Sequence, residues 1–160
     1  MKIWFRYNSR NSYSIAALIP LVDADLVLQP RAGIMLYSFA TPQAGEVYQE
    51  VDRARKAKLD AVFVAGGPHP SAMPEEVLEH FDFVVVGEGE ETLPELIRAI
   101  TDGRDPGTVK GIAYKSQGLI CFTEKRAPVN LDLYPPFTTI LAPIEISRGC
   151  PWGCTYCQTP

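Results

Sequence analysis

Unbroken runs of apolar residues, each four or five residues long, place the strongest constraint on the fold of this chain. Such runs stand at 34–37, 61–65 and 83–86. Strands of this composition are buried on both faces, which is typical of a parallel sheet covered by helices on its two sides. The sequence therefore predicts an α/β fold.

Amphipathic segments separate these runs, as a parallel sheet requires. Residues 41–58 are predicted to form a helix with a proline in its first turn, and acidic residues precede basic ones along it. Thr92 and Glu95 are predicted to form a capping box for a second helix, which Gly103 ends. The remaining expected elements are strands at 3–7, 25–29 and 33–39, helices at 13–21 and 71–79, the latter capped by Ser71, and hairpin strands at 112–115 and 119–123.

These elements predict a Rossmann-like, flavodoxin-like domain over residues 1–108, with an open parallel sheet and helices on both faces. A β-hairpin and a proline-rich linker follow at 109–142. The linker carries prolines at 128, 135 and 136 and has no periodic pattern of its own, so it is expected to wrap between domains.

Composition excludes two classes of partner. The net charge is −4 and no basic block occurs, so no nucleic-acid surface is expected. The longest apolar runs are of strand length, too short to span a bilayer, and residues 1–5 lead directly into an expected strand, so no signal peptide is expected. We expect a cytoplasmic protein, and clustered cysteines fit a reducing compartment.

Two glycine-rich turns mark the candidate ligand site of the sheet. Gly66-Gly67 and Gly87-Glu88-Gly89 each leave a predicted strand at its carboxyl end, where such folds bind ligands. Neither turn matches a nucleotide-binding fingerprint, and Glu88, Glu90 and Glu91 would repel a phosphate. A flat, neutral or amide-bearing ligand is therefore expected, because paired glycines let the backbone approach closely.

A second candidate site lies near the end of the sequence. Cys150, Cys154 and Cys157 form a C-x3-C-x2-C motif with glycines at 149 and 153. Three thiolates without a nearby fourth ligand indicate an iron-sulfur cluster with one open iron, since structural zinc takes four protein ligands. A zinc site completed by Cys121, His69 or His80 and unrelated surface cysteines remain as alternatives.

With the strand-like residues 144–147 before it and Tyr156 inside it, this motif resembles the cluster loop of the radical S-adenosylmethionine enzymes. The resemblance implies that Cys150, Cys154 and Cys157 hold a 4Fe-4S cluster whose open iron binds S-adenosylmethionine, with Tyr156 next to it. It also implies an electron donor such as flavodoxin or ferredoxin. The cofactors then carry the chemistry while the protein orients them.

The glycine turns extend the resemblance to those radical S-adenosylmethionine enzymes that carry an amino-terminal cobalamin-binding domain. The matching stretches are Gly66-Gly67-Pro68-His69, Pro74-Glu75-Glu76, 81–90, and Gly111-Ile112-Ala113-Tyr114 with Gly118. Residues 60–160 match well, and residues 1–60 match only by pattern.

Carried over to this chain, the resemblance implies cobalamin contacts by Gly66, Gly67, His69, Gly87, Glu88 and Gly89. His69 could instead cap a helix or face solvent. The chain departs from one cobalamin pattern, because Asn8-Ser9-Arg10-Asn11-Ser12 stands where D-x-H-x-x-G would follow the first strand. No histidine is therefore expected below the cobalt.

The resemblance further implies that residues 143–160 begin a truncated partial TIM barrel. We expect an amino-terminal fragment that is inactive alone, whose missing barrel completes a radical methyltransferase or a related enzyme. A radical S-adenosylmethionine protein whose front domain no longer binds cobalamin, and serves substrate binding or assembly, is a second hypothesis. A non-enzymatic α/β binding module with a metal-binding tail is a third. The sequence does not identify catalytic residues, substrate or oligomeric state.

Overall fold

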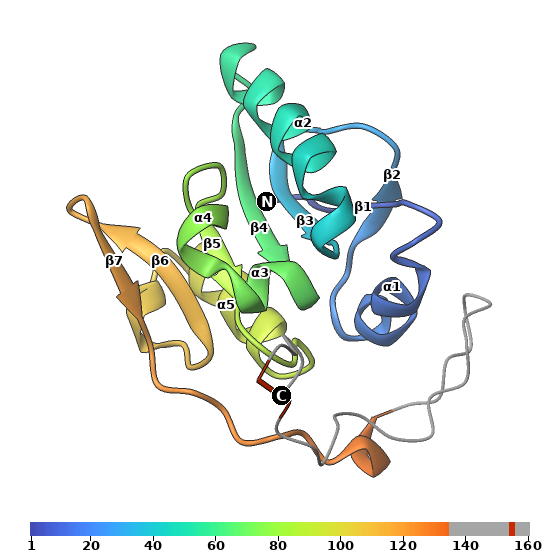
Figure 1. The fold of residues 1–160 in the computed structure, drawn as a ribbon, viewed down its shortest axis with the longest axis vertical. Coiled ribbons are helices and arrows are strands. Elements are labelled where there is room, and N and C mark those ends of the chain that lie inside the picture. The colour runs from blue at the N-terminus through green and yellow to red at the C-terminus, as the bar shows by residue number, and fades with distance from the viewer. Residues whose placement is uncertain (135–153, 156–160) are drawn as a thin grey trace.

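A seven-stranded sheet organises the protein. The computed structural model describes residues 1–134 and 154–155. Strand order is β2-β1-β3-β4-β5-β6-β7; β1 to β5 run parallel, and β6 and β7 are antiparallel (Figure 1). The strands are β1 (Ile3–Arg6), β2 (Asp25–Val27), β3 (Gly33–Ser38), β4 (Ala61–Gly66), β5 (Phe83–Val85), β6 (Ile112–Ser116) and β7 (Leu119–Phe122). The predicted Rossmann-like α/β fold is confirmed, and the hairpin extends the same sheet.

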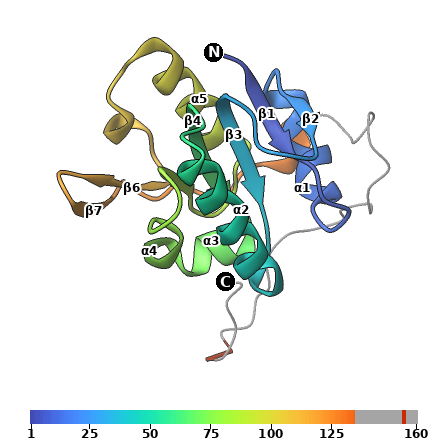
Figure 2. The ribbon, with the colours of Figure 1, turned by 90° about the horizontal axis from the view of Figure 1, so that it is seen from above.

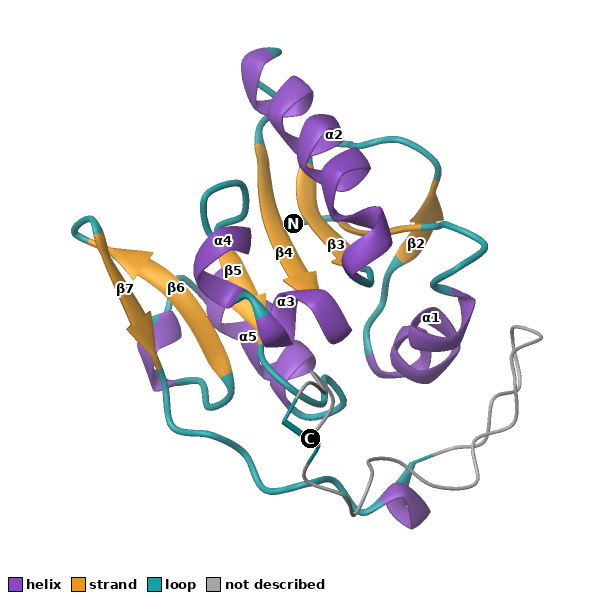
Figure 3. Cartoon of the chain, viewed as in Figure 1, coloured by secondary structure: helices purple, strands orange, loops and turns teal. Residues whose placement is uncertain are grey.

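Helices cover both faces of the sheet. They are α1 (Ser12–Leu18), α2 (Ala44–Lys56), α3 (Pro68–Ala72), α4 (Pro74–Val77) and α5 (Thr92–Asp102). One core packs under α2 and α4, and a second packs under α1 and α5. Figure 2 shows α2 and α5 on opposite sides of the strands, and Figure 3 shows α2 lying along β3 and β4.

The central strand β3 shows why its run is apolar throughout. Met35 and Tyr37 point into the core under α2, whereas Ile34 and Leu36 point into the core under α1 and α5. Successive side chains of a strand alternate between faces, so a strand covered on both sides needs apolar residues at every position.

Three predicted helices differ in detail from the observed ones. The segment 13–21 ends as a 3₁₀ turn, Ile19–Leu21, and the segment 41–58 begins with one, Thr41–Gln43. The predicted helix 71–79 is two short helices, α3 and α4, because Met73 adopts φ −129° and ψ 52° just before Pro74. A residue before proline is pushed out of the helical region, which explains the break.

Gly103 ends α5 in the left-handed conformation, as predicted, but the amino-terminal caps predicted at Ser71 and Thr92 are wrong, because tertiary partners take the side chains. Ser71 Oγ caps no helix but accepts a hydrogen bond of 2.9 Å from the Gly87 amide. The residue at the cap position of α5 is Glu91, and Thr92 Oγ1 accepts from Arg126 Nε at 2.8 Å. Glu95 pairs with the same Arg126 side chain.

Candidate functional site

The carboxyl-terminal edge of the parallel strands is where ligands bind in folds of this kind. The chain passes from β1 outward to β2 and then back past β1 to β3, so the strand order reverses between β1 and β3. Ligands of open α/β sheets bind at that edge near such a reversal. The loops after β1, β3, β4 and β5 meet there, and they include both predicted glycine turns.

The turn after β4 is tightly packed at its second glycine. Gly67 has φ +97°, and a Cβ there would lie 2.8 Å from Ser38 Oγ and 3.1 Å from the Phe39 carbonyl oxygen. Gly66 pairs with Ser38 in the β3–β4 register. A side chain at 67 would therefore suffer both backbone strain and a clash.

The turn after β5 is open. Gly87 has φ +82°, and nothing lies within 4 Å of the position that a Cβ would take. Its amide hydrogen bond to Ser71 Oγ joins it to α3, which follows the Gly66-Gly67 turn. Gly89 packs against Leu18 of α1, and Glu88 Oε2 accepts from the Val129 amide at 2.6 Å. The structure thus brings the two predicted turns together around an accessible backbone.

His69 lies inside the protein. It is 3% exposed, and its ring lies beside that of Phe39, with the centroids 5.7 Å apart and the ring planes tilted by 37°. Its Nε2 lies 2.8 Å from the Tyr48 hydroxyl and its Nδ1 lies 3.1 Å from Thr41 Oγ1. The imidazole therefore has a partner at both nitrogens, and it braces the turn against the Thr41–Gln43 segment. Whether it contacts a ligand stays a prediction.

Burial also acts on Tyr48, the partner of His69. The pKa of its hydroxyl is raised above the ordinary value, first by burial and then by its hydrogen bond to Glu76. The hydroxyl therefore stays protonated and keeps its proton in the hydrogen bond that it donates to Glu76 Oε1.

The loop after β1 contains no histidine, but its Asn11 side chain forms hydrogen bonds that connect two strand ends. Asn11 is 6% exposed, and its Nδ2 donates to the carbonyl oxygens of Arg6 at 2.9 Å and Ser38 at 3.3 Å. Its Oδ1 accepts from the Asn8 amide at 2.8 Å. Asn11 therefore ties the end of β1 to the end of β3, where the strand order reverses.

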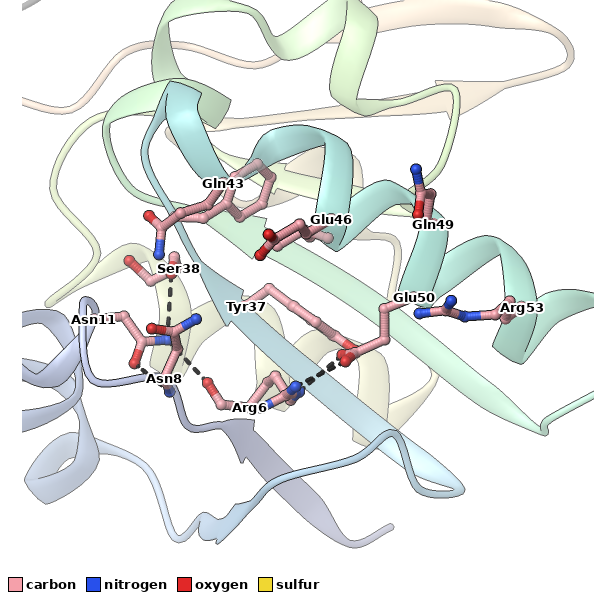
Figure 4. A pocket seen from close by; sticks show the side chains of 12 residues that line it. Arg6, Asn8, Asn11, Tyr37, Ser38, Gln43, Glu46, Gln49, Glu50 and Arg53 are labelled. Atoms are coloured by element: carbon pink, nitrogen blue, oxygen red, sulfur yellow. Dashed lines mark hydrogen bonds and ion pairs between the residues drawn. The ribbon is translucent and has the colours of Figure 1, made fainter.

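A polar pocket of about 300 Å³ extends from this point beneath α2. Figure 4 shows Arg6 and Tyr37 both directed at the Glu50 carboxylate. Arg6 donates from Nε and Nη2 to Glu50 at 2.8 and 2.7 Å, and the Tyr37 hydroxyl donates at 2.9 Å. The pocket's Arg6 and Glu50 charges are thus paired, and amide and hydroxyl groups of Asn8, Asn11 and Ser38 line its end near the glycine turns.

These contacts shift two titrations. The pKa of the Arg6 guanidinium is raised, first by its hydrogen bond with Glu50. The pKa of the Tyr37 hydroxyl is also raised, first by burial and then by the negative charge of Glu50. Both groups therefore keep their neutral-pH protonation states across the physiological range.

The cysteine site is described only in part. Cys154 is exposed, while Cys150, Cys157 and Tyr156 lie outside the described residues, as does the expected barrel strand at 144–147. Within residues 1–134 and 154–155 no three His, Cys, Asp or Glu side chains gather closely enough to hold a metal. His80 pairs with Asp52 at 2.8 Å, and Cys121 lies in β7.

Sequence reasoning found the glycine turns but missed the side chains that hold them. Ser38 ends β3 and Asn11 follows β1 closely, so the rule that selected the glycines would also have selected them. Ser71 and Arg126 carried no such signal, because their partners are 16 and 34 residues away along the chain. Over the described part of the chain, no helix combines the length and apolar character that a membrane crossing needs.

Comparison with known proteins gives two kinds of match. The family model of the B12 binding domain matches residues 16–97. An uncharacterized methyltransferase of Pyrococcus horikoshii is 30% identical over 91% of this chain and 34% of its own length. The anaerobic magnesium-protoporphyrin IX monomethyl ester cyclase of Rubrivivax gelatinosus is 30% identical over 74% of this chain and 25% of its own. The chain thus spans about a third of the length of the first relative and a quarter of the length of the second.

A solved structure shares the fold. The radical S-adenosylmethionine methyltransferase TsrM from Kitasatospora setae, with cobalamin and a [4Fe-4S] cluster bound, superimposes with a TM-score of 0.65 at 18% identity. The match covers 85% of this chain and 31% of that one. At 18% identity this likeness shows only that the two proteins share the arrangement of strands and helices.

Proposed function

Because this chain belongs to the B12-binding domain family, we propose that the carboxyl-terminal edge of its sheet binds cobalamin as part of a radical S-adenosylmethionine protein. One observation carries the proposal: the Gly66-Gly67 and Gly87-Glu88-Gly89 turns lie together, joined through Ser71, with open space over Gly87. A corrin is flat and edged with amides, so it needs close approach to a neutral backbone surface of this kind.

The described residues fit this ligand. Gly87 offers backbone with open space where a Cβ would stand, whereas the corresponding positions of Gly67 and Gly89 face Ser38 and Leu18. The Glu88 carboxylate already accepts from the linker at Val129. His69 would act on the site through the turn that its ring braces, because both ring nitrogens are engaged. Bound cobalamin supplies methyl-carrying chemistry to the protein that holds it.

The lower cobalt face is proposed to lack a histidine ligand. The loop after β1 contains none, and the Asn11 amide is committed to Arg6 and Ser38. Cobinamide, which lacks the nucleotide base of cobalamin, isolates ligation by the protein. We expect the EPR spectrum of bound cob(II)inamide to show no nitrogen superhyperfine splitting, and a nitrogen triplet would contradict this assignment.

For the cysteine motif, we propose a 4Fe-4S cluster on Cys150, Cys154 and Cys157 that binds S-adenosylmethionine beside Tyr156. The spacing of the three cysteines supports it, and TsrM is a radical S-adenosylmethionine protein solved with such a cluster. A barrel of the same polypeptide and a flavodoxin or ferredoxin as electron donor are further proposals. Anaerobic reconstitution of the protein and of its Cys154→Ala variant tests the cluster: loss of the visible iron-sulfur absorption is expected only in the variant.

Radical methyl transfer is the reaction that the similarity to a methyltransferase supports. A second candidate is radical ring formation, because a relative of equal identity is a cyclase. A front domain without cobalamin, acting in substrate binding or assembly, is the alternative from another class. A non-enzymatic module with a metal-binding tail is the remaining one, and zinc as the sole stable metal would favour it.

The experiment that tests cobalamin binding is an anaerobic titration with hydroxocobalamin, followed by desalting and measurement of the retained corrin absorbance. Gly87→Asn fills the open space with a residue that tolerates positive φ. Gly118→Asn is the matched control, because Gly118 has φ +80°, equally open surroundings and a position in the hairpin turn.

We expect stoichiometric retention by the wild type and by Gly118→Asn, and an affinity at least about tenfold weaker in Gly87→Asn, which corresponds to about 1.4 kcal/mol. Absence of retention by the folded wild-type protein would contradict the proposal. Equal retention by both variants would move the site away from the glycine turns.

A further inference from the structure

The segment after β7 runs along the carboxyl-terminal edge of the sheet, past the start of α5 (Figure 1). It is attached at both ends of a short stretch. The Gly111 amide donates to the Glu124 carbonyl oxygen at 2.8 Å, and the Val129 amide donates to Glu88 Oε2 at 2.6 Å. Residues 124–130 therefore form a strap beside the candidate cobalamin site.

Arg126 holds this strap at its centre. Its Nε donates to Thr92 Oγ1 at 2.8 Å, its Nη1 donates to Glu91 Oε2 at 3.2 Å, and its Nη2 pairs with Glu95. The Arg126 side chain is 20% exposed, and Thr92 is fully buried. The fork geometry of a guanidinium suits such a set of divergent acceptors, which a lysine ammonium could not satisfy together.

A positive charge is not generally favourable where Arg126 lies, so its carboxylate partners are needed to hold it there. It lies at the amino-terminal end of α5, where the helix dipole disfavours a cation. Glu91 and Glu95 offset that repulsion with two carboxylates. Close packing supports the same point, because a Cβ on Gly111 would lie 2.9 Å from Thr92 Oγ1 and 3.6 Å from Arg126 Cγ.

The strap reaches the ligand edge through Glu88. This residue is the middle of the Gly87-Glu88-Gly89 turn, so the turn is held from the strap side by Val129. From the opposite side Ser71 of α3 holds the Gly87 amide. Gly87 and Gly89 lack side chains, so these two contacts, together with the hydrogen bond from the Leu93 amide to the Gly89 carbonyl oxygen at 2.9 Å, restrict the conformations open to the turn.

We propose that Arg126 is a positioning residue: it clamps the 124–130 strap to α5 so that Glu88 and the Gly87-Glu88-Gly89 turn are held in the shape that receives the corrin. The part that concerns the corrin rests on the proposed function. Thermodynamic linkage gives a second consequence, since a clamp that strengthens cobalamin binding must itself be strengthened by cobalamin by the same factor.

Hydrogen exchange of single amides tests the clamp without any ligand. We expect Arg126→Gln to accelerate exchange at Val129 and Gly87 at least about tenfold, because an unclamped strap lets Val129 separate from Glu88 and lets the Gly87-Glu88-Gly89 turn open more often. The exchange rates of Arg126→Lys should fall between those of the wild type and Arg126→Gln, since lysine keeps the positive charge but lacks the forked guanidinium. Arg104→Gln is the matched control, because Arg104 pairs with Asp102 near the other end of α5.

A second pair of variants separates the carboxylate's charge from its acceptor. Glu88→Gln keeps an oxygen for the Val129 amide, and we expect it to retain protection there. Glu88→Ala removes the acceptor and should lose protection. Unchanged exchange at Val129 and Gly87 in Arg126→Gln would overturn the clamp.

Hydroxocobalamin titration of the same variants tests the link to the ligand. We expect Arg126→Gln to weaken retention at least about fivefold, or about 1 kcal/mol, with Arg104→Gln unchanged. In the wild type, hydroxocobalamin should slow exchange at Val129 by the same factor by which Arg126→Gln weakens cobalamin affinity. Exchange effects without any cobalamin retention would contradict the proposed function and leave the clamp standing, whereas retention unaffected by Arg126→Gln would overturn the positioning role.

Discussion

Small and polar residues at the strand ends decide the geometry of the candidate site. Gly67 fits under Ser38 and Phe39 only because it has no side chain. Asn11 satisfies two carbonyl oxygens where β1 and β3 diverge. The consequences of changing such residues are local and measurable.

Gly67→Ala is expected to destabilise the protein by about 2 kcal/mol, because the positive φ costs about 1 to 2 kcal/mol and the new Cβ clashes with Ser38. The measurement is urea unfolding at neutral pH. Gly45→Ala is the control: it lies in α2 with nothing within 4 Å and should stabilise by about 0.5 to 1 kcal/mol. Equal stabilities of the two variants would contradict the packing described for Gly67.

Ionisation of Tyr37 is expected to destabilise the protein at alkaline pH. Its hydroxyl pKa is raised above the unfolded value of about 10, so the fold favours the protonated form. The stabilising contribution is complete below pH 10 and is lost as the pH rises above it, by up to about 1.4 kcal/mol per pH unit. In Tyr37→Phe we expect a shallower fall of the unfolding free energy between pH 10 and 11; slopes identical to the wild type would refute this cause.

At the scale of elements, the sequence predicted what repeats locally and not what depends on distant partners. The apolar runs at 61–65 and 83–86 identified β4 and β5, because burial on both faces leaves a local pattern. The Thr92–Glu95 capping box failed, because Arg126 lies 34 and 31 residues further on and takes both side chains. Local rules describe only the acceptors that nearby sequence offers.

The turn of the β6–β7 hairpin gives a prediction about a single element. Gln117 has φ +51° and Gly118 has φ +80°, the pair of left-handed residues that a two-residue type I′ turn needs. Gln117→Asn should stabilise the protein by about 0.5 kcal/mol, because asparagine tolerates this region better. Thermal unfolding monitored by circular dichroism measures the change. Gln117→Val, a β-branched control, should destabilise it, and the reverse order would mean that the turn adopts another form.

For the whole molecule, the candidate site is an edge assembled from loops that are distant in sequence. The rule that ligands bind at the carboxyl ends of the strands was enough to predict that both glycine turns lie on that edge. The same reasoning could not predict that His69 is buried between Tyr48 and Thr41, since a histidine after Gly-Pro is equally compatible with an exposed turn. Nor did it predict the strap that Arg126 fastens. Topology is encoded in patterns, whereas side-chain partnerships depend on packing.

The most direct test of the central claim is hydrogen-deuterium exchange of the protein with and without hydroxocobalamin. If the corrin lies on the sheet edge, amides of residues 66–67 and 87–89 should become protected, while those of the hairpin turn at 116–118 should not change. Protection confined to the pocket beneath α2, or no protection at a saturating concentration, would contradict the claim that the glycine turns hold cobalamin.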